Sequence, residues 1–427
     1  MKTIEATKYK PYETYTKSGI EWLDAIPNNW ELKRLKFLIS QHITDGPHDT
    51  PEFIDEGVAF LSVDGIQDDK LVFEGCRYIS KEDHVRYSVK CSPQKNDILL
   101  GKAASVGKVA IVDVDFEFSV WSPLALIRPN KSILAKFLYY SMKSGYLQDQ
   151  IFILSTSNTQ HNLSMDDIPE LWISLPNLET QKRIVEFLDR ETAKIDEMVA
   201  KKQKMMELLK EKRQALITHA VTKGLDSKAK MRPSGIDWLG DIPVGWDILP
   251  IWMLFFMGRG RVISNEEILD NPGEYPVYSS QTENNGNLGG LATYDFDGDY
   301  ITWTTDGANA GTVFNRSGKF NCTNVCGTLK TKKLKDVDLR FFTHALNVCT
   351  KIFVRYDINP KLMNNVIAGI RVQVPPIKDQ KDICNFLDRE TTKIDEMMKK
   401  VETQIEKLQE YRQALITSAV TGKIMVN

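Results

Sequence analysis

The chain has 427 residues, 42% of them hydrophobic and 26% charged, and its 55 basic and 57 acidic residues give a formal net charge of −2. This length exceeds one usual domain and the composition is that of a folded protein, so we expect two or three domains. The near-neutral charge excludes a polycation that binds nucleic acid through bulk charge, so any nucleic-acid site must be a local patch. Six cysteines and no charged-then-apolar leader predict a reduced, cytoplasmic protein. The longest apolar run, residues 251–257, is too short to span a membrane, so we expect no membrane partner.

The chain contains a duplicated framework. A segment Ser-Gly-Ile-(Glu/Asp)-Trp-Leu, followed by Ile-Pro and Trp, occurs twice at an offset of 216 residues, and Phe-Leu-Asp-Arg-Glu-Thr occurs twice at an offset of 199. The copies are residues 18–23 with 234–239, and residues 187–192 with 386–391. The stretches between them, residues 31–170 (block 1) and 247–370 (block 2), show no comparable match. The framework is therefore duplicated and the contents are not.

Both blocks predict mixed α+β domains. Apolar runs separated by turn residues predict strands, and one longer helical pattern follows the strands in each block. In block 1 the expected strands are 58–63, 71–73, 97–100, 108–112 and 124–127, with a helix at 133–142. In block 2 the expected strands are 300–304, 311–314 and 325–329, with a helix at 339–348.

A long helix follows each block. Residues 180–220 contain neither Pro nor Gly, and apolar residues recur with a period of seven, which indicates a coiled-coil seam. The expected seam residues are Leu188, Ile195, Leu209, Leu216, Leu387, Ile394, Val401, Leu408 and Leu415. A second seam position carries Met198, Met205 and Met397 among others, and Lys202 occupies a place that Val401 fills in the second copy. The stem of Lys202 must reach solvent there.

The linker between the helices favours antiparallel packing. Each helix would be about 60 Å long, whereas the connector 221–234 reaches about 45 Å when fully extended. A parallel pair would need a longer connector, so we expect pseudo-twofold symmetry with one block at each end. The alternative is that each helix packs only on its own domain.

Several motifs suggest catalysis or metal binding but lack required residues. The loop 101–109 resembles a phosphate-binding loop, with five residues between its glycines instead of four and Val109 in place of the metal-binding Ser or Thr. The groups His42, Asp45, His48 and Asp49, and Cys322, Cys326, His344 and Cys349, lack the paired spacing of metal sites. We therefore expect no metal.

The chain also contains an acid-x-lysine pattern and part of a base-flipping motif. Glu31-Leu32-Lys33, with Asp24 upstream, is typical of nucleases, but Asp247-Ile248-Leu249-Pro250 does not keep it in the second copy. Asn359-Pro360-Lys361 lacks the second proline and the aromatic residue of amino-methyltransferases. We predict no catalytic residues in this chain.

Both blocks are rich in side chains that can contact base edges or phosphates. The candidate DNA-binding residues are His48, Thr50, Lys102, Ser105, Lys108, Asn158, Gln160 and His161 in block 1, and Arg259, Arg261, Ser279, Ser280, Gln281, Asn284, Asn309, Arg316, Asn324 and Lys361 in block 2.

The order of these motifs resembles the specificity (S) subunits of type I restriction-modification enzymes. The resemblance covers nearly the whole chain and rests on the two entry segments, the hinges Leu175-Pro176-Asn177 and Val374-Pro375-Pro376, and the two helices that end in Arg-Gln-Ala-Leu-Ile-Thr. The segment 44–51 also looks like one found in target recognition domains of that family.

The resemblance implies a division of the chain into two target recognition domains and two spacer helices. Residues 1–175 would be the first target recognition domain, 176–222 the first long helix, 223–373 the linker and second target recognition domain, and 374–427 the second long helix. The two domains would read the halves of an asymmetric, bipartite DNA site, and the antiparallel coiled coil would fix the gap.

The resemblance also implies a role in restriction, DNA methylation and defence against foreign DNA, without catalysis by this chain. Its partners would be double-stranded DNA, two methyltransferase (M) subunits and restriction and translocase (R) subunits. It would bind no cofactor itself, while S-adenosylmethionine, ATP and Mg²⁺ would bind the partner subunits. The alternatives are a self-contained DNA nuclease or methyltransferase, and an adaptor whose helices join two protein-binding domains.

Overall fold

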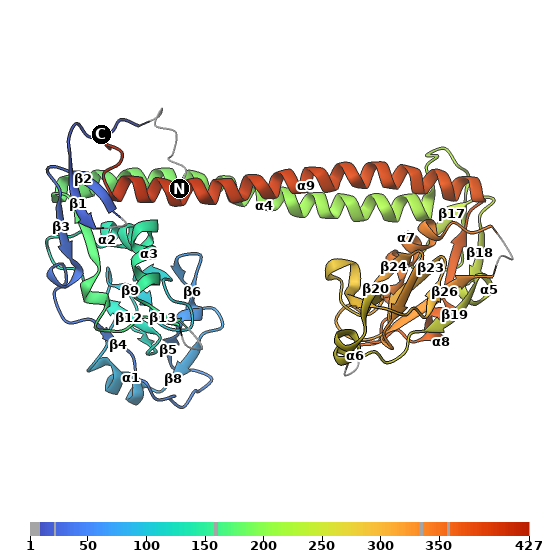
Figure 1. Ribbon diagram of the computed structural model, residues 1–427, viewed down its shortest axis with the longest axis horizontal. Helices are drawn as coiled ribbons and strands as arrows, with labels where there is room; N and C mark the ends of the chain where they lie inside the picture. The colour runs from blue at the N-terminus through green and yellow to red at the C-terminus, as the bar shows by residue number, and fades with distance from the viewer. Residues whose placement is uncertain (1–8, 21–22, 158–160, 333–335, 357–358, 427) are drawn as a thin grey trace. The chain divides into compact units, whose positions relative to one another are not determined.

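The computed structural model describes residues 9–20, 23–157, 161–332, 336–356 and 359–426. The chain forms two compact units, unit 1 (residues 1–203 and 403–427) and unit 2 (residues 204–402). The boundary crosses the two long helices, α4 (Leu178–Lys223) and α9 (Ile377–Val420), so each unit contains one block and one half of each helix (Figure 1).

Short strands and short helices make up unit 1 outside the two long helices. The strands are β1 (Tyr15–Ile20), β2 (Leu23–Pro27), β3 (Glu31–Arg34), β4 (Thr44–Asp45), β5 (Val58–Leu61), β6 (Ile66–Gln67), β7 (Lys70–Leu71), β8 (Arg77–Ile79), β9 (Ile98–Gly101), β10 (Val109–Ile111), β11 (Ser119–Val120), β12 (Leu124–Ile127), β13 (Thr156–Ser157), β14 (His161–Asn162) and β15 (Trp172–Leu175). The helices are α1 (Lys81–Ser88), α2 (Ala135–Lys143) and α3 (Gly145–Leu154), with 3-10 turns η1 (Leu35–Phe37), η2 (Val63–Gly65) and η3 (Ile168–Glu170).

Unit 2 has longer strands and fewer turns. Its strands are β16 (Met231–Pro233), β17 (Asp241–Pro243), β18 (Asp247–Pro250), β19 (Phe255–Arg259), β20 (Pro272–Tyr278), β21 (Asn287–Leu291), β22 (Phe296–Asp297), β23 (Tyr300–Thr304), β24 (Val313–Arg316), β25 (Lys319–Cys322), β26 (Cys326–Thr331) and β27 (Arg371–Val374). The helices are α5 (Ile251–Leu254), α6 (Asn265–Asp270), α7 (Leu339–Cys349) and α8 (Asn364–Gly369), with 3-10 turns η4 (Glu283–Gly286) and η5 (Thr350–Phe353). The mixed α+β class is confirmed.

The two blocks share one sheet topology although their sequences do not match. The antiparallel sheet of block 1 has the order β10-β9-β12-β4, and that of block 2 has the order β24-β23-β26-β19. In unit 1, α2 and α3 lie between the long helices and this sheet, and in unit 2 α7 has the same place (Figure 1). Each block also has a second sheet, of order β11-β5-β8 in block 1 and β21-β20-β25-β22 in block 2, and one pair of strands in each is parallel (β11 with β5, β20 with β25). The sequence does not predict this shared topology, because an apolar pattern indicates a strand but does not indicate which strand it pairs with.

The strands that enter and leave each block pair with each other. β3 is antiparallel to β15 in unit 1, and β18 is antiparallel to β27 in unit 2. The exit strand also binds the last turn of the long helix that belongs to the other copy, through Ser174 Oγ to the carbonyl of Val420 (2.6 Å) and Gln373 Nε2 to the carbonyl of Val221 (2.7 Å). The duplicated framework therefore makes the same contact in both units.

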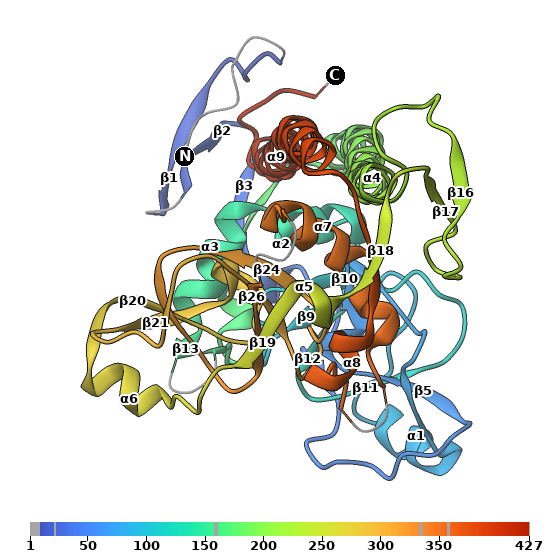
Figure 2. The same ribbon diagram turned by 90° about the vertical axis from the view of Figure 1, so that its right-hand side faces the viewer.

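The entry segments pack on the ends of the helices through tryptophan. A side chain on Gly422 would lie 3.3 Å from the Trp30 ring, and one on Gly224 would lie 3.2 Å from the Trp246 ring. Both glycines have positive φ, +69° and +78°, which favours glycine at the end of a helix. Figure 2 shows the β16–β17 hairpin beside α4, where Lys223 Nζ donates to the carbonyls of Leu239 and Asp241.

The long helices form an antiparallel coiled coil, as the linker predicts. In unit 1, Asp196 of α4 pairs with Arg412 of α9 (2.8 Å), and further along α4 Lys202 Nζ donates to Gln404 (2.5 Å), which lies earlier in α9. In unit 2, Arg213 pairs with Asp395 (2.9 Å), which repeats the Asp196–Arg412 contact with the helices exchanged. The Lys202 amine reaches an exposed partner, as its place in the seam requires.

Burial follows the first seam position. Most residues at the first seam position are buried, and Leu216 and Leu408 are partly buried. At the second seam position, Met198, Met205 and Met397 are 44%, 44% and 37% exposed. The buried positions are Leu188, Ile195, Leu209, Leu387, Ile394, Val401 and Leu415. The two helices therefore bury one narrow row of side chains against each other. Within the described residues, no helix is both long and apolar enough to cross a membrane.

Candidate nucleic-acid interface

A glycine lies directly after the edge strand of the four-stranded antiparallel sheet in each block, where another backbone segment passes very close. A Cβ on Gly46, directly after β4, would lie 1.7 Å from the carbonyl oxygen of Val120, and one on Gly260, directly after β19, would lie 2.2 Å from that of Cys322. Only glycine permits such close backbone approach. The preceding residues, Asp45 and Arg259, are thereby held at matching ends of the two sheets.

In unit 1, Asp45 gathers three basic side chains. Its carboxylate lies 2.5 Å from Lys90 Nζ, 3.3 Å from Lys102 Nζ and 3.2 Å from His48 Nε2. The side chains of Asp45 and Lys102 are only 5% and 10% exposed. Burial alone would raise the pKa of Asp45, but the hydrogen bond and charge of Lys90 and those of Lys102 outweigh it, and the pKa is lowered. No sequence pattern predicts that Lys90 is a partner of Asp45.

The other candidates of block 1 lie in the loop between β9 and β10, which carries Lys102, Ser105 and Lys108, and in two further segments. Lys108 Nζ donates to the carbonyl of Ile66 (2.9 Å), so both lysines of the loop are engaged by protein groups rather than aimed at a phosphate. His161 is exposed beside Phe152, and its Nδ1 lies 3.2 Å from Ser155 Oγ. Thr50 is exposed and Ser105 partly buried, while Asn158 and Gln160 lie outside the described residues.

In unit 2, Asp306 gathers two basic side chains from different elements. It lies 3.5 Å from Arg259 Nη2 at the end of β19 and 3.7 Å from Lys361 Nζ. Arg259 Nε also donates to the carbonyl of Asn324 (2.5 Å). These basic side chains are 39% and 52% exposed, so their charges face solvent.

The same face of unit 2 includes further candidates. Asn309 Nδ2 donates to the carbonyl of Ser280 (3.2 Å), and Thr323 Oγ1 donates to Ser279 Oγ (3.2 Å). Gln281 is partly buried and its amide binds the carbonyl of Asn287 (2.5 Å). The structure thus brings together Arg259, Ser279, Ser280, Asn309, Asn324 and Lys361.

Three candidates of block 2 lie apart from this group or differently from their prediction. Arg261 is bound by Glu267 (2.6 Å) and Asp295 (3.0 Å), and the hydrogen bond to Glu267 raises its pKa despite partial desolvation. Asn284 is exposed in a turn with φ +46°. Arg316 is a correction: it is 3% exposed, so its guanidinium lies in the interior and cannot reach a base edge from there.

The two polar centres lie at the same place in the two sheets, and the residues at the strand ends, Asp45 and Arg259, have opposite charge. Lys102 N donates to the carbonyl of Pro123 and its carbonyl accepts from Leu163 N, while Thr305 makes the same pair of bonds with Val325 and Leu362. In block 1 the acid, Asp45, is at the end of β4, and the cation, Lys102, lies in the loop after β9. In block 2 the arginine is at the strand end, and the acid, Asp306, follows Thr305.

The residues of the catalytic and metal-binding motifs form no common site among the described residues. Lys33 pairs with Glu31 (2.5 Å) on β3. Cys322 and Cys326 lie in one cluster and Cys349 in another. Among the described residues, no three His, Cys, Asp or Glu side chains lie close enough to hold a metal ion.

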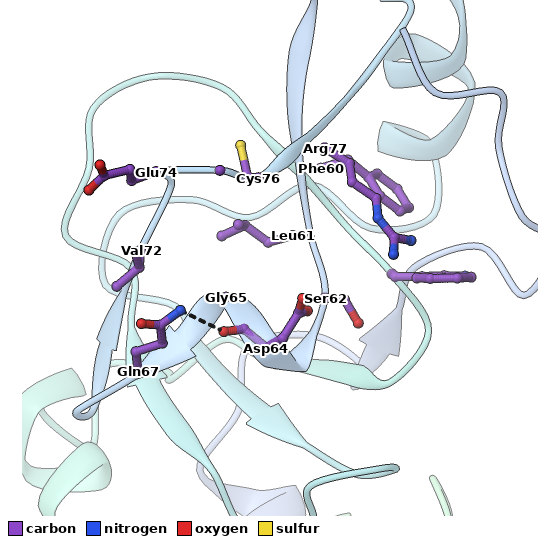
Figure 3. A pocket seen from close by; sticks show the side chains of 12 residues that line it. Phe60, Leu61, Ser62, Asp64, Gly65, Gln67, Val72, Glu74, Cys76 and Arg77 are labelled. Carbon is purple, nitrogen blue, oxygen red and sulfur yellow. Dashed lines mark hydrogen bonds between the residues drawn. The ribbon is translucent and has the colours of Figure 1, made fainter. Parts of the chain in front are cut away.

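A hollow of about 180 Å³ lies on block 1, and Asp45 is not among the residues that line it. Figure 3 shows Arg77 and Phe60 at one end of the hollow, with Asp64 and Gln67 at the other. The Arg77 guanidinium lies 4.8 Å from the centre of the Phe53 ring and 5.7 Å from that of Trp121, and Gln67 Nε2 donates to the backbone carbonyl of Asp64 (3.3 Å). None of the candidate DNA-binding residues lines it.

Comparison with known proteins gives a family for the chain. The model described as "Type I restriction modification DNA specificity domain" matches residues 27–207 and again 243–407. A Mycoplasma pneumoniae chain named "Putative type I specificity subunit", N-terminus, is 48% identical over 131 residues, which cover 30% of this chain and 70% of that one. The specificity subunit of the type I restriction enzyme MpnII of the same organism is 45% identical over 130 residues, 30% of this chain and 39% of that one.

These sequence matches cover only part of the relatives. Apart from the N-terminal chain, the next three Mycoplasma relatives are matched over 35%, 43% and 54% of their length. A chain in a solved structure concerning complex assembly and conformational transition of the type I R-M system has a TM-score of 0.71 at 13% identity, covering 93% of this chain and 99% of that chain. This last match shows that the two chains share a fold.

Proposed function

Because the chain belongs to the type I restriction modification DNA specificity family, we propose that it is the DNA sequence-specificity subunit of a type I restriction-modification complex. Block 1 reads one half of a bipartite site and block 2 reads the other half. The chain itself performs no catalysis. A self-contained nuclease or methyltransferase is not favoured, because the family model that matches both halves of the chain is that of a DNA specificity domain.

The observation that carries the proposal is the pair of polar centres on one shared fold. Asp45 and Arg259 stand at the same strand end, yet their neighbours differ in charge and identity. Base edges in the major groove are distinguished by their pattern of donors and acceptors. Two frames of the same shape with different polar groups are therefore suited to reading two different sequences.

The continuous helices support a role as a spacer. Helix α4 runs from one unit into the other without a break, and so does α9 in the opposite direction. A coiled coil resists bending, and half-sites must be separated by a defined number of base pairs. We therefore propose that the helices set the gap between the half-sites.

The catalytic steps belong to partner subunits. Two methyltransferase subunits would bring S-adenosylmethionine, and restriction subunits would bring ATP and Mg²⁺. Near-neutral net charge fits this arrangement, since partners can supply many of the phosphate contacts that hold the duplex. The complex would act in the cytoplasm.

A genome-wide map of methylated adenines tests the proposal. The map is recorded in the host with and without the gene for this chain. We expect one split motif with a fixed gap to lose methylation on deletion and to regain it when the gene is restored. An active partner methyltransferase whose motifs do not depend on this chain would contradict the proposal.

A paired insertion tests the spacer role. One heptad is added after Gln203 in α4 and one after Glu402 in α9, so that the seam stays in register. Each helix grows by about 10 Å, and we expect the gap to grow by about 3 base pairs. A methylated motif with an unchanged gap would contradict the spacer role.

A further inference from the structure

One arginine of block 1 has no protein partner among the described residues. Block 1 contains four arginines, and the guanidinium of Arg77 forms neither a hydrogen bond nor an ion pair within the described part of the chain. The residue is exposed, so its donors are free to bind a ligand. The other three arginines are held by acids, in the pairs Arg34–Glu170, Arg86–Asp83 and Arg128–Asp97.

Aromatic rings hold the Arg77 guanidinium in place. It lies 4.8 Å from the centre of the Phe53 ring and 5.7 Å from that of Trp121. The rings of Phe53, Phe60 and Trp121 pack against one another with their centres 6.0 to 6.4 Å apart, and Phe60 is buried. Stacking on aromatic rings restricts the orientation of a guanidinium. Arg77 therefore loses little side-chain entropy when it binds a ligand.

The hollow beside Arg77 lies at the place in block 1 that corresponds to the candidate interface of block 2. The residue after β11, Trp121, donates its backbone N–H to the last residue of β5 (2.8 Å), and the residue after β25, Thr323, donates to the last residue of β20 (2.9 Å). The residues that follow β5 and β20 are Ser62 and Ser279. Ser279 belongs to the candidate interface of block 2 and binds Thr323 (3.2 Å). Their counterparts, Ser62 and Trp121, both line the hollow.

Two acids at the hollow make it unsuitable for a phosphate. Asp64 and Glu74 line it and are exposed, and neither carboxylate has a cationic partner among the residues that the structure describes. Like charges repel, so a phosphate of the DNA backbone is disfavoured here. The edge of a base carries no net charge, and it presents hydrogen-bond acceptors and donors.

The two ends of the hollow match the major-groove edge of a G·C pair. Figure 3 shows Arg77, a donor, at one end and Asp64, an acceptor, at the other. Guanine presents the acceptors O6 and N7, and its partner cytosine presents the N4 amine as a donor. Arginine binds the two guanine acceptors with two parallel hydrogen bonds.

We propose that Arg77 is a specificity-determining residue of block 1 and reads a guanine through O6 and N7. The inference rests on the proposed function, because it assigns a residue to the reading of DNA by block 1. Arg77 is absent from the sequence candidates, since only the pairing of β5 with β8 brings it beside Phe60.

A map of methylated adenines tests the assignment. Arg77→Ala is expressed with the partner methyltransferase in a host that lacks the natural gene, and its motif is compared with that of the natural chain. The half read by block 1 is the half that changes when residues 31–170 are exchanged. We expect a guanine on one strand of this half, and in Arg77→Ala the preference for guanine at that position should fall about tenfold. The other half and the gap should not change.

Two further variants separate base reading from phosphate binding and from a structural role. Arg77→Lys keeps the charge but cannot form two parallel hydrogen bonds, so it should relax the same position as Arg77→Ala. Arg86→Ala removes another exposed arginine of block 1, which lies over the Tyr87 ring (4.7 Å), and should leave the motif unchanged. A uniform loss of methylation in Arg77→Ala, with an unchanged motif, would indicate a phosphate contact or a structural role and would overturn the proposal.

A modified base tests the contact with the natural chain, so this test does not depend on the folding of a variant. The natural chain, bound to its methyltransferase subunits, is titrated with duplexes in which each guanine of the block 1 half is replaced in turn by 7-deazaguanine, which lacks the N7 acceptor. We expect one of these duplexes to bind about tenfold more weakly than the unmodified duplex. Equal binding of all duplexes, or a block 1 half without guanine, would overturn the proposal.

The same duplexes identify the residue that reads the guanine. The Arg77→Ala complex should bind the sensitive duplex and the unmodified duplex equally, because the N7 contact is already lost. A tenfold difference that persists in Arg77→Ala would assign the guanine to another residue and overturn the proposal.

Failure of the proposed function gives a different result. If the natural chain with its methyltransferase subunits methylates no split motif, the specificity role is refuted and the assignment of Arg77 with it. A split motif that depends on the natural chain, and that Arg77→Ala leaves unchanged, refutes the assignment of Arg77 alone.

Discussion

The polar centres of the two blocks differ in where the acid stands and in how far it is buried. In unit 1 the acid, Asp45, is at the strand end and buried, and the cations of Lys90 and Lys102 converge on it. In unit 2 the strand end carries Arg259, and Asp306 is 25% exposed between two partly exposed cations. The first arrangement is a closed ion cluster and the second an open one. The shared sheet therefore fixes where side chains stand and leaves their chemistry free to differ.

The largest expected difference concerns the two acids. Asp45→Asn leaves the buried Lys102 ammonium without its counter-charge, and we expect a loss of about 3 kcal/mol in the free energy of unfolding. Asp306→Asn affects cations that water can solvate, and should cost less than about 1 kcal/mol. Thermal unfolding of the full chain, with each unit's transition followed separately, measures both. Equal losses would show that the two centres do not differ in burial as described.

The stability of unit 1 should depend on pH through Asp45. Its pKa is lower in the folded state than in the unfolded state, so its contribution is complete above the unfolded value of about 3.9 and is lost as the pH falls through the folded value. The difference in midpoint between the natural chain and Asp45→Asn should stay constant from neutral pH down to about 5 and shrink below about 4. A difference that grows on acidification would contradict this sign.

Substitutions at matching positions of the duplicated framework should lower the free energy of unfolding equally, in contrast to those in the two blocks. Gln181 binds Leu134 N (2.8 Å) and the carbonyls of Ser132 and Pro176, and Gln380 binds Asp338 N (2.8 Å) and the carbonyls of Asp336 and Pro375. Gln181→Met and Gln380→Met each leave a backbone donor without this partner, at a cost of about 2 kcal/mol. Denaturant unfolding measures the pair, with the exposed Gln409→Met as control. A difference above about 1 kcal/mol between the two variants would break the equivalence of the framework.

The smallest expected effect on stability concerns the duplicated arginines of the helices. Arg412 is 20% exposed and binds Asp196 (2.8 Å) and Asp69 (3.7 Å), whereas Arg213 is 38% exposed and binds Asp395 (2.9 Å). Arg412→Ala should cost about 1 to 2 kcal/mol and Arg213→Ala less than about 1. A double-mutant cycle with Asp69→Asn isolates the extra contact. Equal costs that Asp69→Asn does not change would show that block 1 gains nothing from binding α9 there.

The sequence sufficed for the features that repeat. The period of seven at Leu188 and Leu387 predicted the coiled coil, and the connector predicted its antiparallel direction. The strands 124–127 and 300–304 were found as expected, because apolar runs between turn residues have few other uses. The shared topology of the blocks was missed, since pairing partners are set by tertiary contacts rather than by local pattern.

The contacts within the polar centres could not be predicted from the sequence. Asp45 and Lys90 are 45 residues apart, and nothing local marks them as partners. Arg316 is a candidate from sequence because arginine can bind base edges and phosphates, yet its guanidinium lies over the aromatic rings of Tyr278 and Phe314 in the interior. The close approach of Gly46 to Val120 is likewise visible only when both backbones are in place.

Exchange of one block tests the central claim most directly. Residues 31–170 are replaced by the matching block of another family member, and methylated adenines are mapped in a host that carries the partner methyltransferase. Two independent readers predict a new motif in which one half changes while the other half and the gap are kept. A motif that changes in both halves, or in neither, would contradict the account.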